Sequence, residues 1–171
     1  MSILGRLQEL LDERGVEYEV LHHREDFRAR TTAADTHTPA GEFAKTVVMW
    51  VDGAYALAVL PATHFVAEGR FERSVGAEKA RLATEFEMRD LLPDCEVGAA
   101  PPIGGLFGLP TYASPVLARS EHITFNAGTH SDAVRLTWSA YHGLAEPKVV
   151  AMSRHEEDWR EPAREPRPQR L

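Results

Sequence analysis

Two apolar runs, residues 45–51 and 55–60, stand on either side of the pair Asp52-Gly53. Asp-Gly between apolar runs is a strong short-range signal for a β-hairpin, because both residues accept the positive φ angles of a tight turn. Both runs are nearly continuous rather than alternating, which is typical of strands covered on both faces. We therefore predict a hairpin of two central strands.

The rest of the chain predicts short helices and strands in mixed order. Ser2 begins a helix whose apolar residues fall on one face, and Gly15 ends it. Thr84 and Glu87 have the spacing of a capping box, which predicts a helix over residues 85–92. The remaining expected elements are strands at residues 16–21, 123–126, 133–138 and 149–152, a short helix within residues 31–38, and a short helix capped by Ser139.

These elements belong to one domain. The chain has no internal repeat and no second apolar unit, and 171 residues suit a single core. We therefore expect a compact α+β domain over residues 1–152. Residues 153–171 are charged and rich in proline without periodicity, and we expect this C-terminal tail to be disordered.

Composition and charge restrict the function classes. No apolar run approaches the roughly 20 residues of a membrane helix, and no export signal stands at the N-terminus. These two absences, together with a single cysteine that suits a reducing compartment, predict a cytoplasmic protein with no membrane partner. The formal net charge of −7 argues against a DNA partner and against any large nucleic-acid interface held by charge alone. A local basic patch can still contact one RNA end.

The common catalytic and cofactor motifs are absent. The chain has no nucleophile elbow, no phosphate-binding glycine motif and no zinc-binding HExxH helix. His22 and His23 are adjacent and would point to opposite faces of a strand, so we expect no metal site and no cofactor. Cys95 stands between two acidic residues, which raise the pKa of a thiol, and is expected to be structural.

Three segments remain as candidates for a functional site. Lys45 begins an apolar strand, where a lysine is either a solvated charge or a functional cation. Residues 98–110 contain four glycines and three prolines, and loops of that length are often functional. Residues 125–130 are mostly small and polar, as in a plain turn or a binding loop.

Together these segments resemble the YbaK/ProX superfamily of aminoacyl-tRNA deacylases, related to the editing domain inserted in bacterial prolyl-tRNA synthetases. The resemblance rests on residues 42–48 (EFAKTVV), 95–104 (CEVGAAPPIG) and 125–130 (FNAGTH), and covers residues 4–152 in the right order. It implies a mixed, barrel-like β-sheet flanked by helices. Members of the superfamily hydrolyse the ester between a wrong amino acid and the terminal ribose of tRNA, commonly tRNA for proline.

The resemblance also implies the residues of the site. Lys45 matches the functional lysine, and Gly98 and Pro102 match the ends of a G-x-x-x-P loop, so these three are the expected catalytic residues. The residues expected to bind substrate are Ala99, Ala100, Pro101, Ile103, Gly104, Asn126, Gly128 and His130. The expected partner is the 3′ end of a mischarged aminoacyl-tRNA, with an aminoacyl-tRNA synthetase as a further candidate.

These residue types suit ester hydrolysis. Negative charge develops on the carbonyl oxygen, and a glycine loop can bring backbone N–H donors close to it. Lys45 offers a compact charge to a phosphate or to the carbonyl. The resemblance implies that the ribose hydroxyl of the substrate helps to position water, and we favour a hydrogen-bonding role for His130 over a role as base. A small pocket would exclude proline.

Two other functions stay open on the sequence alone. One is a non-catalytic module that binds aminoacyl groups or tRNA ends, and the other is a hydrolase of small esters unrelated to tRNA. The acidic net charge favours the small-ester hydrolase, whereas the joint presence of Lys45, Gly98 and Pro102 favours an enzyme over a binding module. The run Gly104-Gly105-Leu106-Phe107 replaces the more usual Gly-Asn-Leu-Tyr and leaves the amino acid open.

Overall fold

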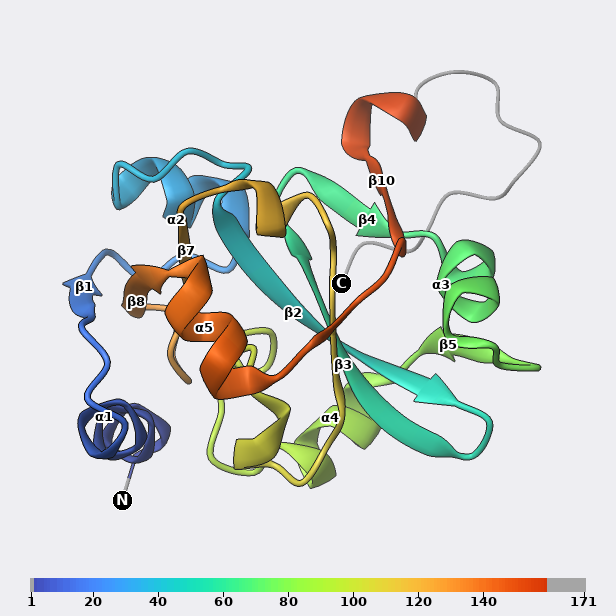
Figure 1. Cartoon of the computed structure of the whole chain (residues 1–171), viewed down its shortest axis with the longest axis horizontal. Coiled ribbons are helices and arrows are strands. Elements are labelled where there is room, and N and C mark those ends of the chain that lie inside the picture. Colours follow the sequence, from blue (N-terminus) through green and yellow to red (C-terminus); the bar gives the residue numbers. More distant parts are fainter. Residues whose placement is uncertain (1, 160–171) are drawn as a thin grey trace.

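The predicted hairpin forms the middle of the molecule in the computed structural model, which describes residues 2–159. β2 (Phe43–Val51) pairs antiparallel with β3 (Ala54–Pro61) along almost its whole length. Asp52 and Gly53 at the turn have φ angles of 47° and 88°, as a tight hairpin turn requires. The hairpin prediction is confirmed, and Figure 1 shows the two long strands crossing the centre of the fold.

The hairpin is part of a mixed sheet. Its other strands are β1 (Glu19–His22), β5 (Ala80–Leu82), β6 (Thr111–Ala113), β7 (His122–Asn126), β8 (Asp132–Thr137) and β9 (Lys148–Val149). The strand order is β1-β8-β7-β2-β3-β6-β9, and β5 also pairs with β2. β2 is parallel to β7, and β6 is parallel to both β3 and β9. Because the order has two ends, the described strands do not close into a complete barrel.

Helices cover the sheet on both faces. They are α1 (Ile3–Glu13), α2 (Ala29–Asp35), α3 (Glu68–Val75), α4 (Glu85–Leu91) and α5 (Trp138–Ala145), with 3-10 turns η1 (Gly104–Leu106) and η2 (Leu117–Arg119). Ala44 of β2 packs in one core cluster with residues of α1 and α5, whereas Val47 and Met49 pack with Phe71 of α3. Both faces of β2 are therefore buried, as its continuous apolar run predicts.

Local signals predicted several helix ends correctly. The Ser2 hydroxyl accepts a hydrogen bond from Gly5 N at 3.0 Å, and Gly15 adopts a φ of 65° just after α1. Thr84 and Glu87 form both hydrogen bonds of a capping box at the start of α4.

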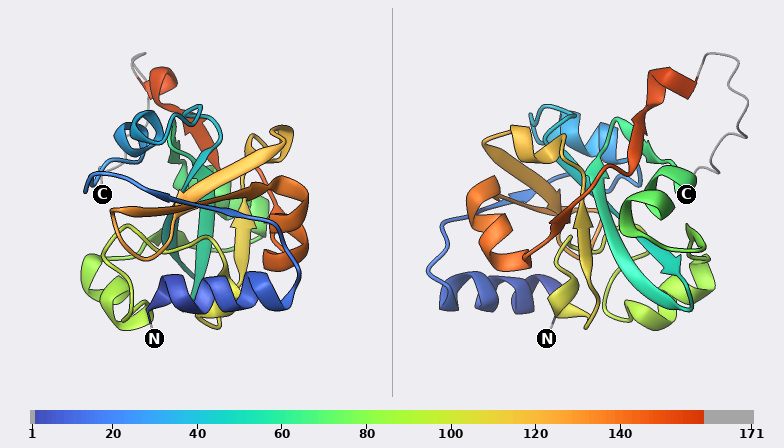
Figure 2. Two further views of the ribbon diagram at one scale, coloured as in Figure 1. Left: turned by 90° about the vertical axis from the view of Figure 1, so that its left-hand side faces the viewer. Right: turned by 45° about the vertical axis from the view of Figure 1, so that its right-hand side comes forward.

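In Figures 1 and 2, α1 lies at the opposite end of the molecule from α2.

Several predicted boundaries are wrong, and the strand predicted at residues 149–152 is only the two-residue β9, Lys148–Val149. β1 begins at Glu19 rather than at residue 16, and α2 begins at Ala29, before the predicted segment. Thr137, not Ser139, caps α5, because the Thr137 hydroxyl accepts from Ala140 N at 3.1 Å. Both are hydroxyl residues, and the strand–helix junction falls at Thr137 because β8 runs up to it.

The fold also continues past residue 152. β10 (Ser153–His155) pairs antiparallel with β4 (His64–Val66), and η3 (Glu156–Trp159) follows (Figure 1). The predicted tail is therefore wrong for residues 153–159, where backbone pairing with β4 outweighs the polar composition. Residues 160–171 lie outside the described part of the chain. Among residues 2–159, no helix has the length and apolar character needed to cross a bilayer.

Candidate active site

A groove of about 1100 Å³ opens along β2, where this strand changes its neighbour. On the side away from β3, β2 pairs first with β7 through Phe43 and Ala44, and then with β5 through residues 49–51. Among the described strands, residues 45–47 pair only with β3. This gap in the sheet leaves room for Gly98 and for His130, which line the groove with β2.

Lys45 lies in this groove. Its Nζ is 4.5 Å from the centre of the Phe65 ring, a cation–π contact. Burial lowers the pKa of Lys45 to about 8, and the nearby negative charge of Glu156 opposes this shift. The lysine is therefore mostly charged at neutral pH in surroundings that disfavour the charge, a state typical of functional sites.

Glu156 reaches the groove from η3. β10 places it there by pairing with β4, where Ser153 Oγ and His64 Nδ1 are 2.9 Å apart. The Glu156 carboxylate accepts a hydrogen bond from Arg30 Nη1 of α2 at 2.7 Å. Both residues of this ion pair line the groove, so α2 and the C-terminal segment meet at the site.

The loop over residues 97–102 is held in place by its carbonyl oxygens. Each of three carbonyls accepts a hydrogen bond from a group behind the loop. These are Val97 O from His130 Nε2 at 2.7 Å, Ala99 O from Gly128 N at 2.8 Å, and Pro102 O from the buried Tyr141 hydroxyl at 2.7 Å. The loop is thus fixed against the turn after β7 and against α5.

The same anchoring leaves backbone donors free. In the part of the chain that the structure describes, the N–H groups of Gly98 and Ala100 donate to no protein acceptor, and both residues line the groove. Gly98 adopts a φ of 83°, which favours glycine. Free N–H donors in a groove that also holds a cation can stabilise the negative oxygen formed in ester hydrolysis.

Three polar side-chain atoms in the groove are buried without a hydrogen-bond partner among the described residues. They are Thr46 Oγ1, Asn126 Oδ1 and His130 Nδ1. Because His130 Nε2 faces a carbonyl oxygen, it carries the proton of the neutral ring, and Nδ1 is a free acceptor. Unpaired buried polar atoms are unfavourable unless a ligand or water satisfies them. Because all three residues line the same groove, the groove is the candidate binding site.

Comparison with known proteins places the chain in a family. Residues 23–143 match the model of the aminoacyl-tRNA editing domain. The chain belongs to the aminoacyl-tRNA editing domain family. One relative is the multifunctional Ser/Thr-tRNA deacylase ProXp-y of Escherichia coli (strain K12), which is 30% identical over 154 residues covering 87% of this chain and 92% of the relative. This editing-domain protein is an aminoacyl-tRNA deacylase, a hydrolase of mischarged tRNA, as its sequence predicted.

Solved structures share the fold of this editing domain. A candidate trans-editing enzyme for prolyl-tRNA synthetase superposes with a TM-score of 0.79 at 24% identity, covering 90% of this chain and 98% of that one. The hypothetical protein APE2540 superposes with a TM-score of 0.79 at 17% identity, covering 87% and 99%. The predicted fold class, an α+β domain with a mixed sheet and flanking helices, is confirmed.

The predicted site residues of the editing domain divide into two groups. Those that line the groove are Lys45, Gly98, Ala100, Asn126 and His130. Those that lie buried outside the groove lining are Ala99, Pro101, Pro102, Ile103, Gly104 and Gly128. A Cβ on Gly128 would lie 1.5 Å from Ile3 Cγ2, and one on Gly104 would lie 2.1 Å from Leu109 O. These two glycines permit close packing behind the loop.

Other groove residues were missed in the sequence. Thr46 lies inside a stretch that carried the family resemblance, although it has no distinctive spacing. Phe27, Arg28 and Arg30 belong to an arginine-rich segment before and within α2, and their charge pattern was the available signal. Phe65 and Glu156 had no local signal. The lining residues that were not predicted include Phe27, Arg28, Arg30, Thr46, Phe65 and Glu156, together with three further carboxylates, Glu25, Glu85 and Glu96.

Cys95 lies outside the groove lining, and its thiol is not activated. Burial, followed by the charge of Asp94, raises the pKa of Cys95 to about 11, so the thiol is protonated at neutral pH. Between residues 2 and 159, no group of three or more His, Cys, Asp or Glu side chains is placed to share a metal ion. Lys45, the free amides of the loop and the His130 imidazole are groups in the groove that can take part in ester hydrolysis.

Proposed function

We propose that this chain hydrolyses the ester of a tRNA mischarged with a small amino acid, with serine and threonine as the first candidates and tRNA for proline as the acceptor. The observation that carries the proposal is that residues with unpartnered polar atoms and free loop amides line the same groove as Lys45. The relative named as a Ser/Thr-tRNA deacylase supports the choice of amino acids. We expect the reaction to take place in the cytoplasm.

In the proposed reaction, the ester carbonyl oxygen faces the N–H groups of Gly98 and Ala100. Water adds to the carbonyl carbon, and the negative charge on oxygen is stabilised by these donors and by the charge of Lys45. The bond between the carbonyl carbon and the ribose oxygen then breaks. The ribose oxygen takes a proton, and the free amino acid and the tRNA leave. The neighbouring ribose hydroxyl helps to position the water.

The free acceptors supply a basis for choosing the amino acid. His130 Nδ1 and Asn126 Oδ1 are buried acceptors, with 3% and 7% of their residues' surfaces exposed. A serine or threonine hydroxyl, or the α-ammonium group of any aminoacyl ester, can donate to them. A site that leaves buried polar groups unpaired rejects a substrate without the matching donor more strongly than an apolar pocket does.

The test is single-turnover deacylation by wild type of four esters on one tRNA for proline: seryl, threonyl, alanyl and prolyl. We expect rapid loss of the seryl or threonyl ester and no acceleration of the prolyl ester above the buffer blank. His130→Ala should reduce the preference for seryl over alanyl ester by about tenfold. Rates equal to the blank on all four esters would refute this substrate assignment. Binding without hydrolysis would favour the non-catalytic module instead.

A further inference from the structure

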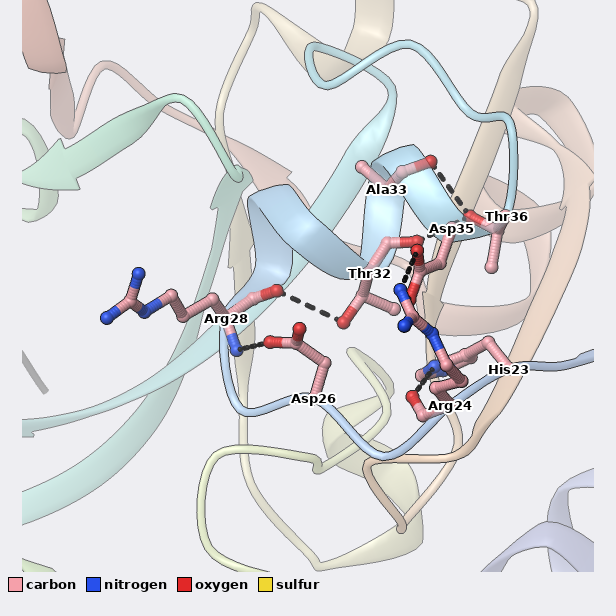
Figure 3. A network of polar contacts seen from close by, with 8 residues as sticks. All are labelled: His23, Arg24, Asp26, Arg28, Thr32, Ala33, Asp35 and Thr36. Carbon is pink, nitrogen blue, oxygen red and sulfur yellow. Dashed lines mark hydrogen bonds and ion pairs between the residues drawn. The ribbon is translucent and has the colours of Figure 1, made fainter.

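The segment before α2 is fixed in position although its side chains are exposed. Asp26 N donates to His130 O at 3.2 Å, and Asp26 Oδ1 accepts from Arg28 N at 2.8 Å. Arg28 O accepts from Thr32 N at 3.0 Å and from Thr32 Oγ1 at 3.1 Å (Figure 3). The backbone of residues 26–28 is therefore held between the groove and α2, and its side chains start from a fixed place.

Phe27 presents an aromatic ring in the groove. It is 71% exposed, and its ring contacts the His130 ring, with 4.5 Å between centroids and 52° between planes. A single exposed apolar residue is ordinary on a protein surface. This ring, however, contacts the histidine whose Nδ1 has no partner among the described residues, and most of its surface is exposed where it lines the groove.

Arg28 adds a positive charge that has no carboxylate partner in the described part of the chain. Its neighbours in sequence are paired: Arg24 Nη2 is 3.1 Å from Asp35 Oδ1, and Arg30 Nη1 is 2.7 Å from Glu156 Oε1. Among residues 2–159, no carboxylate pairs with the Arg28 guanidinium, and Figure 3 shows this side chain directed away from the other residues drawn. Arg28 also lines the groove, so its charge is available to an anion there.

An exposed ring in a groove, next in sequence to a guanidinium with no carboxylate partner among residues 2–159, is suited to a nucleotide, whose base stacks and whose phosphate pairs with the cation. We propose that Phe27 and Arg28 form the subsite for the terminal nucleotide of the tRNA, with the adenine stacked on Phe27 and its phosphate against Arg28. This inference rests on the proposed function, because the terminal nucleotide carries the ester and must lie beside it.

The experiment compares three substrates that carry the same amino acid: aminoacyl-tRNA, aminoacyl-adenosine and the amino acid methyl ester. Phe27→Ala should raise the concentration for half-maximal rate about tenfold on the two substrates that contain adenine, and Phe27→Trp should not. Neither variant should change the rate on the methyl ester. Arg28→Ala should weaken the binding of aminoacyl-tRNA and leave the two smaller substrates unaffected. It should also lower the slope of log affinity for tRNA against log salt concentration by about 0.7.

Two control variants match these changes outside the groove. Phe86→Ala removes a ring that is 75% exposed on α4 but does not line the groove. Arg14→Ala removes the same charge at the end of α1, at the opposite end of the molecule from α2 (Figure 2). Both controls should match wild type on all three substrates.

The outcomes separate this inference from the proposed function. If Phe27→Ala and Arg28→Ala bind and deacylate aminoacyl-tRNA as wild type does, the nucleotide subsite is refuted and the proposed function stands. If Phe27→Ala slows the methyl ester as much as the tRNA, Phe27 only supports His130, and the subsite is again refuted. If wild type hydrolyses none of the three substrates, the proposed function fails, and the inference fails with it.

Discussion

At the scale of single residues, Lys45 lowers the stability of the fold. Its pKa in the folded state is about 8, against 10.5 for an ordinary lysine. Between these two pH values the unfolded chain binds more protons, so the free energy of unfolding rises with pH across this window. Below about pH 8 the destabilisation by the buried charge is fully present.

Lys45→Met should therefore stabilise the protein at pH 7 by on the order of 1–3 kcal/mol, with a smaller gain at pH 9.5. Glu156 keeps its ion pair with Arg30, so the substitution leaves no buried carboxylate unpaired. Urea denaturation of both proteins at both pH values measures the difference. An equal gain at the two pH values, or a loss at pH 7, would show that the lysine is not held at a lowered pKa.

The charge of Lys45 should also set the alkaline limit of the reaction. After subtraction of the buffer rate, wild-type deacylation should decline above about pH 8 as Lys45 loses its proton. Lys45→Arg keeps its charge well above this pH, so its lower rate should show no such decline. Single-turnover rates from pH 6 to 9.5 test this. Parallel profiles for the two proteins would assign the decline to another group.

Sequence motifs predicted some of the residues that line the candidate groove, and lining residues outside any motif were missed. Lys45 and Gly98 stand in stretches whose order along the chain matches a family, so both were predicted. Glu156 lies among charged residues whose composition predicts a tail, and only its pairing with Arg30 reveals its place. Phe27 is exposed, and an exposed aromatic residue has no periodic pattern that identifies it.

At the scale of elements, the turn after β7 depends on contact between Gly128 and α1. Gly128→Ala should lower the free energy of unfolding by more than about 2 kcal/mol. The added Cβ would overlap Ile3, and a φ of 96° is strained for alanine. Gly53→Ala is the matched control, with a φ of 88° and nothing within 4 Å of its Cβ. Its cost should be about 1 kcal/mol. Equal losses in urea denaturation would rule out the steric contribution of Ile3.

Elements were predictable where a local signal decides them. The Asp52-Gly53 turn and the Thr84 capping box are set by neighbouring residues, and both appear as predicted. Thr137 and Ser139 are equivalent as caps, and the choice between them depends on where β8 ends. β10 is a strand of three polar or charged residues, and it exists only because the β4 edge is beside it.

At the scale of the whole molecule, the C-terminal segment completes the groove. A chain that ends at residue 159 keeps every described contact and should match the full chain in Tm and in rate. A chain that ends at residue 152 loses β10 and the ion pair between Arg30 and Glu156, and its Tm should fall by about 3–8 °C. Its alkaline limit should also move to lower pH, since the Glu156 charge raises the pKa of Lys45.

Thermal denaturation and pH–rate profiles of both shortened chains measure these effects. Full stability in the chain that ends at residue 152 would show that β10 and η3 add nothing to the domain. Loss of stability in the chain that ends at residue 159 would place a necessary contact beyond the described residues.

The proposed role of Lys45 in hydrolysis is tested most directly by single-turnover deacylation of the preferred mischarged tRNA by wild type, Lys45→Ala and Lys148→Ala. Lys148 is an exposed lysine on β9 and controls for the loss of one positive charge. The groove geometry predicts a rate at least about 100-fold lower for Lys45→Ala, with Lys148→Ala equal to wild type. A Lys45→Ala rate within about twofold of wild type, in a folded protein, would contradict the assignment of this groove as the active site.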